Sequence, residues 1–323
     1  MDYNKERRRK SLNKNIVLFC IFCWIVPILI IYISMTISYK ESIEKKLKNI
    51  FIEKLRSTDI FIANYLDEVI ESSRKPSYEY YLEKAWNEYI LQGSDGRNDC
   101  YQTISSNLRN KFYWDKRFDI CSFYIEGEDE PFAYLSSSNY SMENYMNKIH
   151  NRIKEARERD SSYIQLIVEN DRIFIVRNVY TTNNYEKFGT LVLELNKKNM
   201  FSDIVLDEGQ TLVFCINNSN GFIAKQDFFE DKKRADIAKD ILSKYSIKDK
   251  NKIIIKQNSD YYAYLLEIKH DDYHLGILLT VDKAIINAEM NHVYSMIFIL
   301  LVIIIPVLII IIYFLKKQIT API

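Results

Sequence analysis

Glycine and proline are scarce in this chain, which has seven glycines and five prolines in 323 residues. Neither of the glycine-rich phosphate-binding patterns, GxGxxG or GxxxxGK[ST], occurs, so nucleotide binding of these two types is not expected. Basic and acidic residues nearly cancel, giving a net charge of +1. No bulk positive charge therefore indicates a nucleic-acid partner. These absences exclude classes of function but select none.

Cysteines are few and odd in number. Cys20 and Cys23 lie in the first apolar run, which leaves Cys100, Cys121 and Cys215 outside it. An odd count argues against a disulfide framework. Cys100 and Cys121 could pair, but no sequence fixes the Cα separation of about 5.5 Å that a disulfide needs. The alternative is three small buried apolar side chains.

No arrangement of residues indicates catalysis or metal binding. The segment His270-Asp271-Asp272-Tyr273-His274 holds two histidines four residues apart. We expect it on a hairpin turn, where the two rings need not converge, so a solvated turn is preferred to a metal site. No Ser/His/Asp or Cys/His arrangement stands out, and an extracellular hydrolase has no residues to support it. We expect no catalytic residue, metal or cofactor.

Two apolar runs without a charge stand near the ends of the sequence, at residues 16–37 and 294–315. A helix of 22 residues is about 33 Å long, enough to cross a bilayer core of about 30 Å. The first run is too long for a signal peptide and lacks a cleavage site, so we expect an anchor. Basic residues precede the first run and follow the second, which predicts cytoplasmic termini and residues 39–293 outside.

A long helix is predicted over residues 41–73, which contain neither glycine nor proline, and Pro76 ends it. Side chains recur there at alternating steps of four and three residues, the spacing of a heptad seam: Phe51, Leu55, Thr58, Ile62, Tyr65 and Val69. Two interpretations are open. The stripe packs on its own domain, or part of it faces a second subunit in a homodimer.

Beyond this helix the pattern changes from helical to alternating. Helical stretches at 78–91 and 99–114 are separated by turn residues at 92–96. Alternating residues then predict strands over 119–126, 131–136, 163–168, 172–180 and 188–195, with a helix over 142–157. The same order returns with strands over 212–217, 222–225, 252–257, 261–268 and 274–281, and a helix over 229–245.

Landmarks in the two halves keep nearly constant separations, as a duplicated architecture requires. The separation is 91 residues from Ile125 to Ile216, 89 from Asp171 to Asp260 and 87 from Gly189 to Gly276. We therefore expect an α+β fold with two tandem antiparallel-sheet units. Each sheet should have one face under its inserted helix and the other against the long helix.

The pattern divides the chain as follows. We expect a basic cytoplasmic tail over 1–15, a first transmembrane helix over 16–38, a long signalling helix over 39–76, a membrane-distal unit over 77–196, a membrane-proximal unit over 197–282, a helix running into the second transmembrane helix over 283–315, and the start of a cytoplasmic linker over 316–323.

This organisation resembles the double Cache extracytoplasmic sensor, in which two PAS-like units follow a long helix. The resemblance covers residues 40–293 and rests on architecture. The tail Ile319-Thr320-Ala321-Pro322-Ile323 is similar to the opening of a HAMP linker, which makes Thr320, Pro322 and Ile323 the expected signal output. The low-glycine, Lys- and Ile-rich composition is similar to sensor histidine kinases of the YesM type.

The resemblance implies a homodimeric membrane receptor that binds an extracellular small molecule and acts on a cytoplasmic response regulator through a histidine kinase domain. Chemoreceptors and other Cache–HAMP receptors have similar outer halves. No ATP-binding domain lies in these residues, so no catalytic residue is carried over. A non-signalling assembly protein with two spans, such as a polysaccharide co-polymerase, stays open as an alternative, although such proteins are mainly helical.

In Cache sensors the ligand usually lies in the membrane-distal unit, between the sheet and the helices leading into it. The resemblance places it here at Trp114, Arg117, Tyr124, Tyr134 and Arg177. Aromatic rings offer flat walls, and arginine can bind a carboxylate through two hydrogen bonds. The motif of amino-acid-binding members is not found in register. For each residue the alternative is a core aromatic or a surface arginine. Arg177 interrupts an apolar strand face and needs a partner there.

Overall fold

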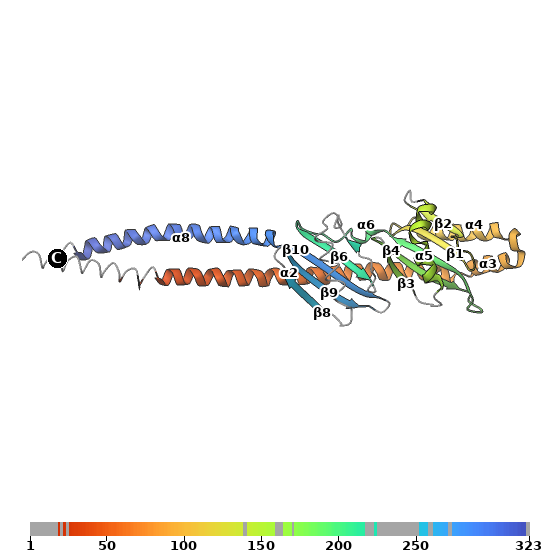
Figure 1. Ribbon diagram of the computed structural model, residues 1–323, viewed down its shortest axis with the longest axis horizontal. Coiled ribbons are helices and arrows are strands. Elements are labelled where there is room, and N and C mark those ends of the chain that lie inside the picture. The colour runs from red at the N-terminus through yellow and green to blue at the C-terminus, as the bar shows by residue number, and fades with distance from the viewer. Residues whose placement is uncertain are drawn as a thin grey trace, which may run out of the picture. The chain divides into compact units, whose positions relative to one another are not determined.

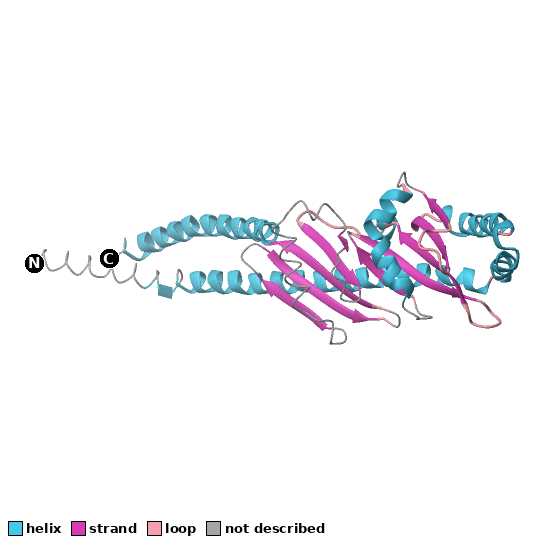
Figure 2. Ribbon diagram, turned by 45° about the vertical axis from the view of Figure 1, so that its right-hand side comes forward, coloured by secondary structure: helices cyan, strands magenta, loops and turns pink. Residues whose placement is uncertain are grey.

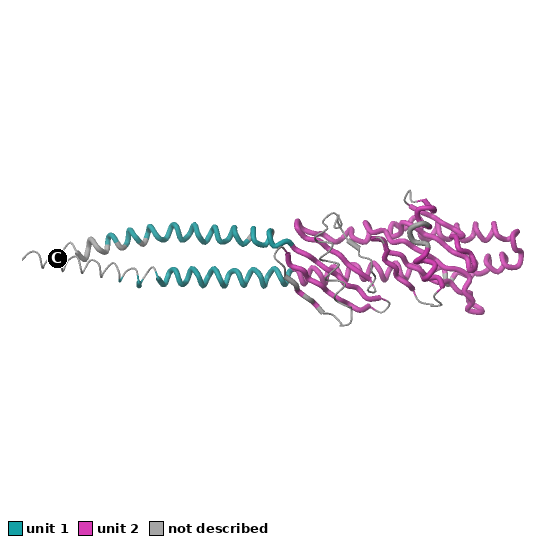
Figure 3. Tube along the Cα trace, in the orientation of Figure 1, with its two compact units in different colours: residues 1–50, 282–323 teal, residues 51–281 magenta. Residues whose placement is uncertain are grey.

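A computed structural model gives the structure of the protein and describes residues 19, 22–23, 26–137, 141–158, 164–169, 171–216, 223–224, 252–257, 261–270 and 273–320. The chain divides into two compact units (Figure 3). One comprises residues 51–281 and the other residues 1–50 with 282–323.

The unit of residues 1–50 and 282–323 is helical where it is described, apart from Asp282, the last residue of a strand. It contains the first half of α2 (Val26–Arg74) and all of α8 (Lys283–Thr320). Large apolar side chains along both segments are exposed. By length and composition both helices could cross a membrane. Of the predicted output residues, Thr320 ends α8, while Pro322 and Ile323 lie outside the described residues.

The unit of residues 51–281 begins with the second half of α2, which packs along the sheets. The predicted seam is buried at Phe51, Leu55, Thr58, Ile62 and Val69. The Phe51 ring, for example, lies 5.3 Å from that of Tyr264 in the second sheet. The interpretation that this stripe packs on its own domain is therefore confirmed for these residues.

Short helices follow α2, as the sequence predicted. They are η2 (Lys75–Tyr78), α3 (Tyr80–Gln92), η3 (Gly93–Asp95), α4 (Arg97–Leu108) and the π-helical turn η4 (Arg109–Tyr113). The break between α3 and α4 falls at Gly93, whose φ of 61° is one that glycine adopts readily. Pro76 lies just past the end of α2.

The first sheet has five antiparallel strands in the order β2-β1-β5-β4-β3 (Figures 1 and 2). Its elements are β1 (Phe118–Ile125), β2 (Ala133–Ser136), α5 (Met142–Glu158), β3 (Gln165–Glu169), β4 (Arg172–Tyr180) and β5 (Lys187–Leu195). The predicted order of strands and inserted helix is confirmed. A short helix, α6 (Lys197–Met200), follows.

The second sheet repeats this order as β7-β6-β10-β9-β8. Its strands are β6 (Gln210–Ile216), β7 (Ile223–Ala224), β8 (Lys252–Gln257), β9 (Tyr261–Lys269) and β10 (His274–Asp282). The two sheets thus share one strand order, as the constant separations predicted. The helix predicted over 229–245 lies outside the described residues.

The three cysteines outside the first apolar run are free and buried. Cys100 and Cys121 therefore do not form a disulfide. Burial raises the pKa of the Cys100 and Cys215 thiols to about 11, so both stay protonated at neutral pH. The interpretation as small buried apolar side chains holds.

Candidate functional site

The face of the first sheet under α5 is built around Tyr145. This side chain is fully buried, and its hydroxyl lies 3.0 Å from Ser122 Oγ and accepts a hydrogen bond of 3.4 Å from Tyr124. Ser122 and Tyr124 are two apart on β1, so both point to the same face. Burial raises the pKa of Tyr124 to about 12 and that of Tyr145 well above its usual value. Both phenols are therefore neutral hydrogen-bonding groups.

Tyr134 joins the same cluster from β2. It is paired in register with Ser122, and its ring centroid lies 5.4 Å from that of Tyr145. Two of the five residues predicted to bind ligand, Tyr124 and Tyr134, therefore come together. Sequence reasoning missed Tyr145, although the helix that carries it was predicted over 142–157.

A pocket of about 500 Å³ opens at one end of this cluster. It is formed by the turn after β1, the last turns of α5 and the start of β5. The lining residues are Glu126, Gly127, Glu128, Asp129, Lys154, Arg157, Glu158 and Lys187. Three of them are basic and four acidic, so the pocket offers groups of both signs to a polar ligand.

Arg157 connects the pocket with the tyrosine cluster. The residue is only 9% exposed, and its guanidinium lies 4.3 Å from the centroid of the Tyr124 ring. Its Nη2 donates to the carbonyl oxygens of Ile125, at 3.3 Å, and Glu128, at 2.8 Å. Its Nε has no hydrogen-bond partner among the described residues. This buried donor is the group of the pocket that an acceptor on a bound ligand would satisfy.

Lysines hold the other sides of the pocket. Lys154 pairs with Asp129 at 3.1 Å, and Lys187 pairs with Glu126 at 3.1 Å. Lys187 also donates to the carbonyl oxygen of Arg157 at 2.6 Å. These contacts join α5 to the turn after β1 and to β5.

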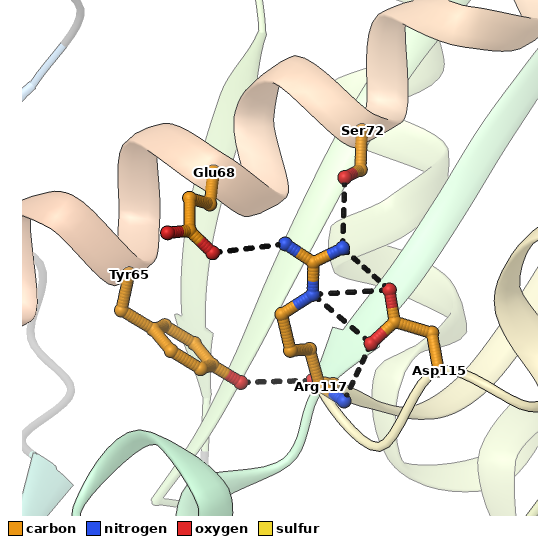
Figure 4. A network of polar contacts seen from close by, with 5 residues as sticks. All are labelled: Tyr65, Glu68, Ser72, Asp115 and Arg117. Carbon is orange, nitrogen blue, oxygen red and sulfur yellow. Dashed lines mark hydrogen bonds and ion pairs between the residues drawn. The ribbon is translucent and has the colours of Figure 1, made fainter. Parts of the chain in front are cut away.

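Arg117, a third predicted ligand residue, lies in a network with α2 instead (Figure 4). Its guanidinium donates to Asp115 at 2.5 Å, to Ser72 at 3.1 Å and to Glu68 at 3.2 Å. The Tyr65 hydroxyl donates to the Arg117 carbonyl oxygen at 2.9 Å. These contacts tie the start of β1 to α2.

Arg177 and Trp114 also lie apart from the pocket. Arg177 pairs in register with Leu191, which pairs with Phe123, so it shares the face of Phe123 and not that of Tyr124. Arg177 is buried, and its Nε donates to Ser73 of α2 at 2.9 Å. Ser73 is thus a partner of the kind that the sequence predicted for this arginine. Trp114 is 75% exposed. The five residues expected at one site are therefore divided between separate surroundings.

No metal centre is found in the part of the chain that the structure describes, where no three His, Cys, Asp or Glu residues lie close enough to hold an ion. His270 and His274, the two histidines weighed as ligands, flank the turn between β9 and β10. The His270 ring contacts Asp59 of α2.

No protein-family model matches the chain, and no curated protein matches it in sequence. Among solved structures, the chain resembles the extracellular domain of a protein described as a histidine kinase, vpHK1S-Z8. The identity is 12%, the TM-score is 0.50, and the match covers 75% of this chain and 97% of that one.

Two further structures have lower TM-scores. The ligand-binding domain of the Campylobacter jejuni chemoreceptor Tlp3 in complex with L-valine is 13% identical at a TM-score of 0.47, over 77% of this chain and 97% of that one. A domain of a sensory box/GGDEF family protein from Vibrio parahaemolyticus is 14% identical at 0.46, over 74% and 97%. The first comparison shows that this chain shares its fold with that extracellular domain.

Proposed function

We propose that the chain is the sensory part of a transmembrane receptor that binds a small molecule outside the cell. The observation that carries the proposal is the pocket of about 500 Å³ lined by charges of both signs. It lies on the first sheet of a fold shared with an extracellular domain. In the sequence, this fold stands between two segments apolar enough to cross a membrane.

The pocket favours a ligand that carries both a carboxylate and a cationic or hydrogen-donating group. Arg157 and Lys187 are the least exposed cations of the lining and would bind the carboxylate. Glu126, Glu128 and Glu158 supply acceptors for an ammonium group. An amino acid or a short peptide has this chemistry, and an organic acid or a sugar satisfies only part of it.

A thermal-shift screen of the full chain in lipid nanodiscs tests the proposal against amino acids, organic acids, sugars and short peptides. We expect a zwitterionic compound to raise the melting temperature. Lys187→Gln, which removes a proposed partner of the carboxylate, and Glu158→Gln, which removes a proposed partner of the ammonium group, should each weaken its binding by about tenfold. Lys84→Gln, on an exposed ion pair of α3 outside the pocket, is the matched control. Binding that survives both pocket variants unchanged would place the ligand elsewhere.

We also propose the membrane topology that the charges around the apolar runs predict, with residues 39–293 outside and both termini in the cytoplasm. Signal would leave through α8, because β10 ends at Asp282 and α8 begins at the next residue. Thr320, Pro322 and Ile323 would then begin a HAMP linker to a histidine kinase domain and its response regulator. Labelling of introduced cysteines on intact cells with a membrane-impermeant maleimide tests this topology.

The receptor is further proposed to be a homodimer through the exposed side of α2. Five of the six residues of the heptad seam are already buried. By contrast, Ile60 and Phe61 are 59% and 47% exposed, and Asn64 is exposed one turn further on. Two copies anchored in one membrane are parallel, so this side of α2 meets the same residues of its partner in an isologous contact.

Cross-linking of single cysteines tests the dimer in membranes, in a chain with Cys20 and Cys23 replaced by serine. Phe61→Cys should give an inter-subunit product with a short bifunctional maleimide. Ile62→Cys, one residue away and fully buried, should give none and is the control. Absence of product from cysteines at 60, 61 and 64 alike would argue for a monomer or for a different face.

A further inference from the structure

In each sheet, the hairpin of the last two strands is held on a helix by a carboxylate. On the first sheet, Glu83 of α3 accepts hydrogen bonds from the Thr182 amide at 2.9 Å and the Thr182 hydroxyl at 2.5 Å. On the second sheet, His270 Nε2 lies 3.3 Å from Asp59 Oδ1 of α2. The two contacts occupy corresponding places, but the donor is a threonine in one and an imidazole in the other.

The His270 side chain is held in place by the turn that carries it. Its ring is stacked on Tyr273 with centroids 4.8 Å apart, and its amide donates to the Tyr273 carbonyl oxygen at 2.8 Å. The Tyr273 hydroxyl in turn lies within hydrogen-bond distance of Asp67 Oδ1, at 3.2 Å, and of the Ala63 carbonyl oxygen, at 3.3 Å. The β9–β10 hairpin therefore contacts α2 at Asp59, Ala63 and Asp67, along two turns of the helix.

The surroundings of His270 are acidic. Asp59, only 7% exposed, and Asp67 face the hairpin from α2. The other described titratable residues near His270 in the hairpin are Lys269, which is exposed, Tyr273 and His274. The sequence adds Asp271 and Asp272, which lie outside the described residues. Burial raises the pKa of the Asp59 carboxyl, while its hydrogen bond with His270 opposes that effect.

We propose that His270 and Asp59 form a proton-binding clamp, by which the second sheet responds to acidity outside the cell. Histidine side chains change charge between about pH 5 and 8, so protonation of the imidazole would turn its hydrogen bond to the carboxylate into an ion pair. In the corresponding Glu83 contact the donor is threonine, which does not change charge between about pH 5 and 8. Use of the clamp as a signal rests on the proposed receptor function, but proton binding itself does not.

The direction of the pH effect differs between the two hairpins. A proton gained by an imidazole beside a carboxylate strengthens their contact, so we expect a more firmly held β9–β10 hairpin at about pH 5.5 than at about pH 7.5. Still lower pH protonates Asp59, whose pKa is raised, and removes the bond. For Glu83, the hydrogen bond from the Thr182 hydroxyl lowers the pKa below the usual 4.5. Its contribution is thus complete above about pH 5 and is lost only as the pH falls further.

Hydrogen exchange of the full chain in phosphatidylcholine nanodiscs tests the clamp at pH 5.5 and 7.5, after correction for intrinsic exchange rates. We expect amides of the β9–β10 hairpin to exchange about fivefold more slowly at pH 5.5, and those of the β4–β5 hairpin to be unchanged. His270→Asn should abolish the difference. His274→Gln, which removes the neighbouring histidine, should retain it.

The proposal is overturned if the natural chain shows no pH difference at the β9–β10 hairpin, if the difference survives His270→Asn, or if His274→Gln removes it. Should His270→Asn not fold, Asp59→Asn provides the second test and must also abolish the difference. Because these outcomes are measured without any ligand, a failed ligand screen and a failed clamp are distinguishable.

Discussion

Replacement of Tyr145 by alanine should lower the free energy of unfolding by about 3–5 kcal/mol, the range for removing a large aromatic side chain from a core. Tyr145 is fully buried, and its ring is enclosed by α5 and by Ile120, Phe174 and Val192 of the sheet. These neighbours belong to three strands that hydrogen bonds hold in place, so they cannot close the space that the ring leaves. Chemical denaturation of the full chain in detergent, followed by near-ultraviolet circular dichroism, measures the loss.

Tyr145→Phe is the matched control, because it keeps the ring and removes only the hydroxyl. It leaves Ser122 and Tyr124 without a shared partner and should cost about 1–2 kcal/mol. Equal losses for the two variants would mean that the hydroxyl network, and not the packing of the ring, holds α5 on the sheet.

Substitution of Gly189 by alanine should cost about 1–3 kcal/mol, in spite of adding a single methyl group. A Cβ at this position would lie 2.4 Å from two atoms of the Phe123 ring and 2.8 Å from the Tyr124 carbonyl oxygen. The ring could turn aside, but the carbonyl belongs to the β1–β5 ladder, where Tyr124 is paired with Thr190. The backbone would therefore have to shift between the two central strands.

A second substitution separates these two contacts. Phe123→Leu in the Gly189→Ala background shortens the side chain and should recover part of the loss, while the close approach to the carbonyl oxygen stays. The same denaturation measurement is used for both variants. If Gly189→Ala alone costs less than about 0.5 kcal/mol, within the range of an ordinary surface change, the strands are less closely packed than described.

The order of strands and helices along the chain could be predicted from the sequence, because the alternation of apolar and polar residues is a local property of each strand; the order of the strands within each sheet was not predicted. Pairs of landmarks with nearly equal separations, Gly189 and Gly276 among them, indicated a repeat. Both glycines do lie on the last strand of a sheet, β5 and β10 respectively. Glycine at these places has a physical reason in the first sheet, where Phe123 fills the space of a side chain.

The composition of the candidate site could be predicted only in part. Alternation shows that Ser122 and Tyr124 share a face, but the face of Arg177 depends on strand register, which two strands far apart in sequence do not reveal. The same holds for the heptad seam, whose spacing is equally suited to a sheet and to a second helix. Arg157 carried no recognisable signal, since basic residues are common along an amphipathic helix.

The Tyr65 hydroxyl joins α2 to the first sheet where two of its strands meet. Its hydroxyl lies 2.9 Å from the carbonyl oxygen of Arg117 and 3.4 Å from that of Asn196, the residues that flank the start of β1 and the end of β5. Burial raises the pKa of this phenol far above neutrality, so the donor persists at every physiological pH. Tyr65 therefore fastens the paired ends of β1 and β5 to one turn of α2, and the Arg117 contacts with Glu68 and Ser72 extend this attachment along the next turn.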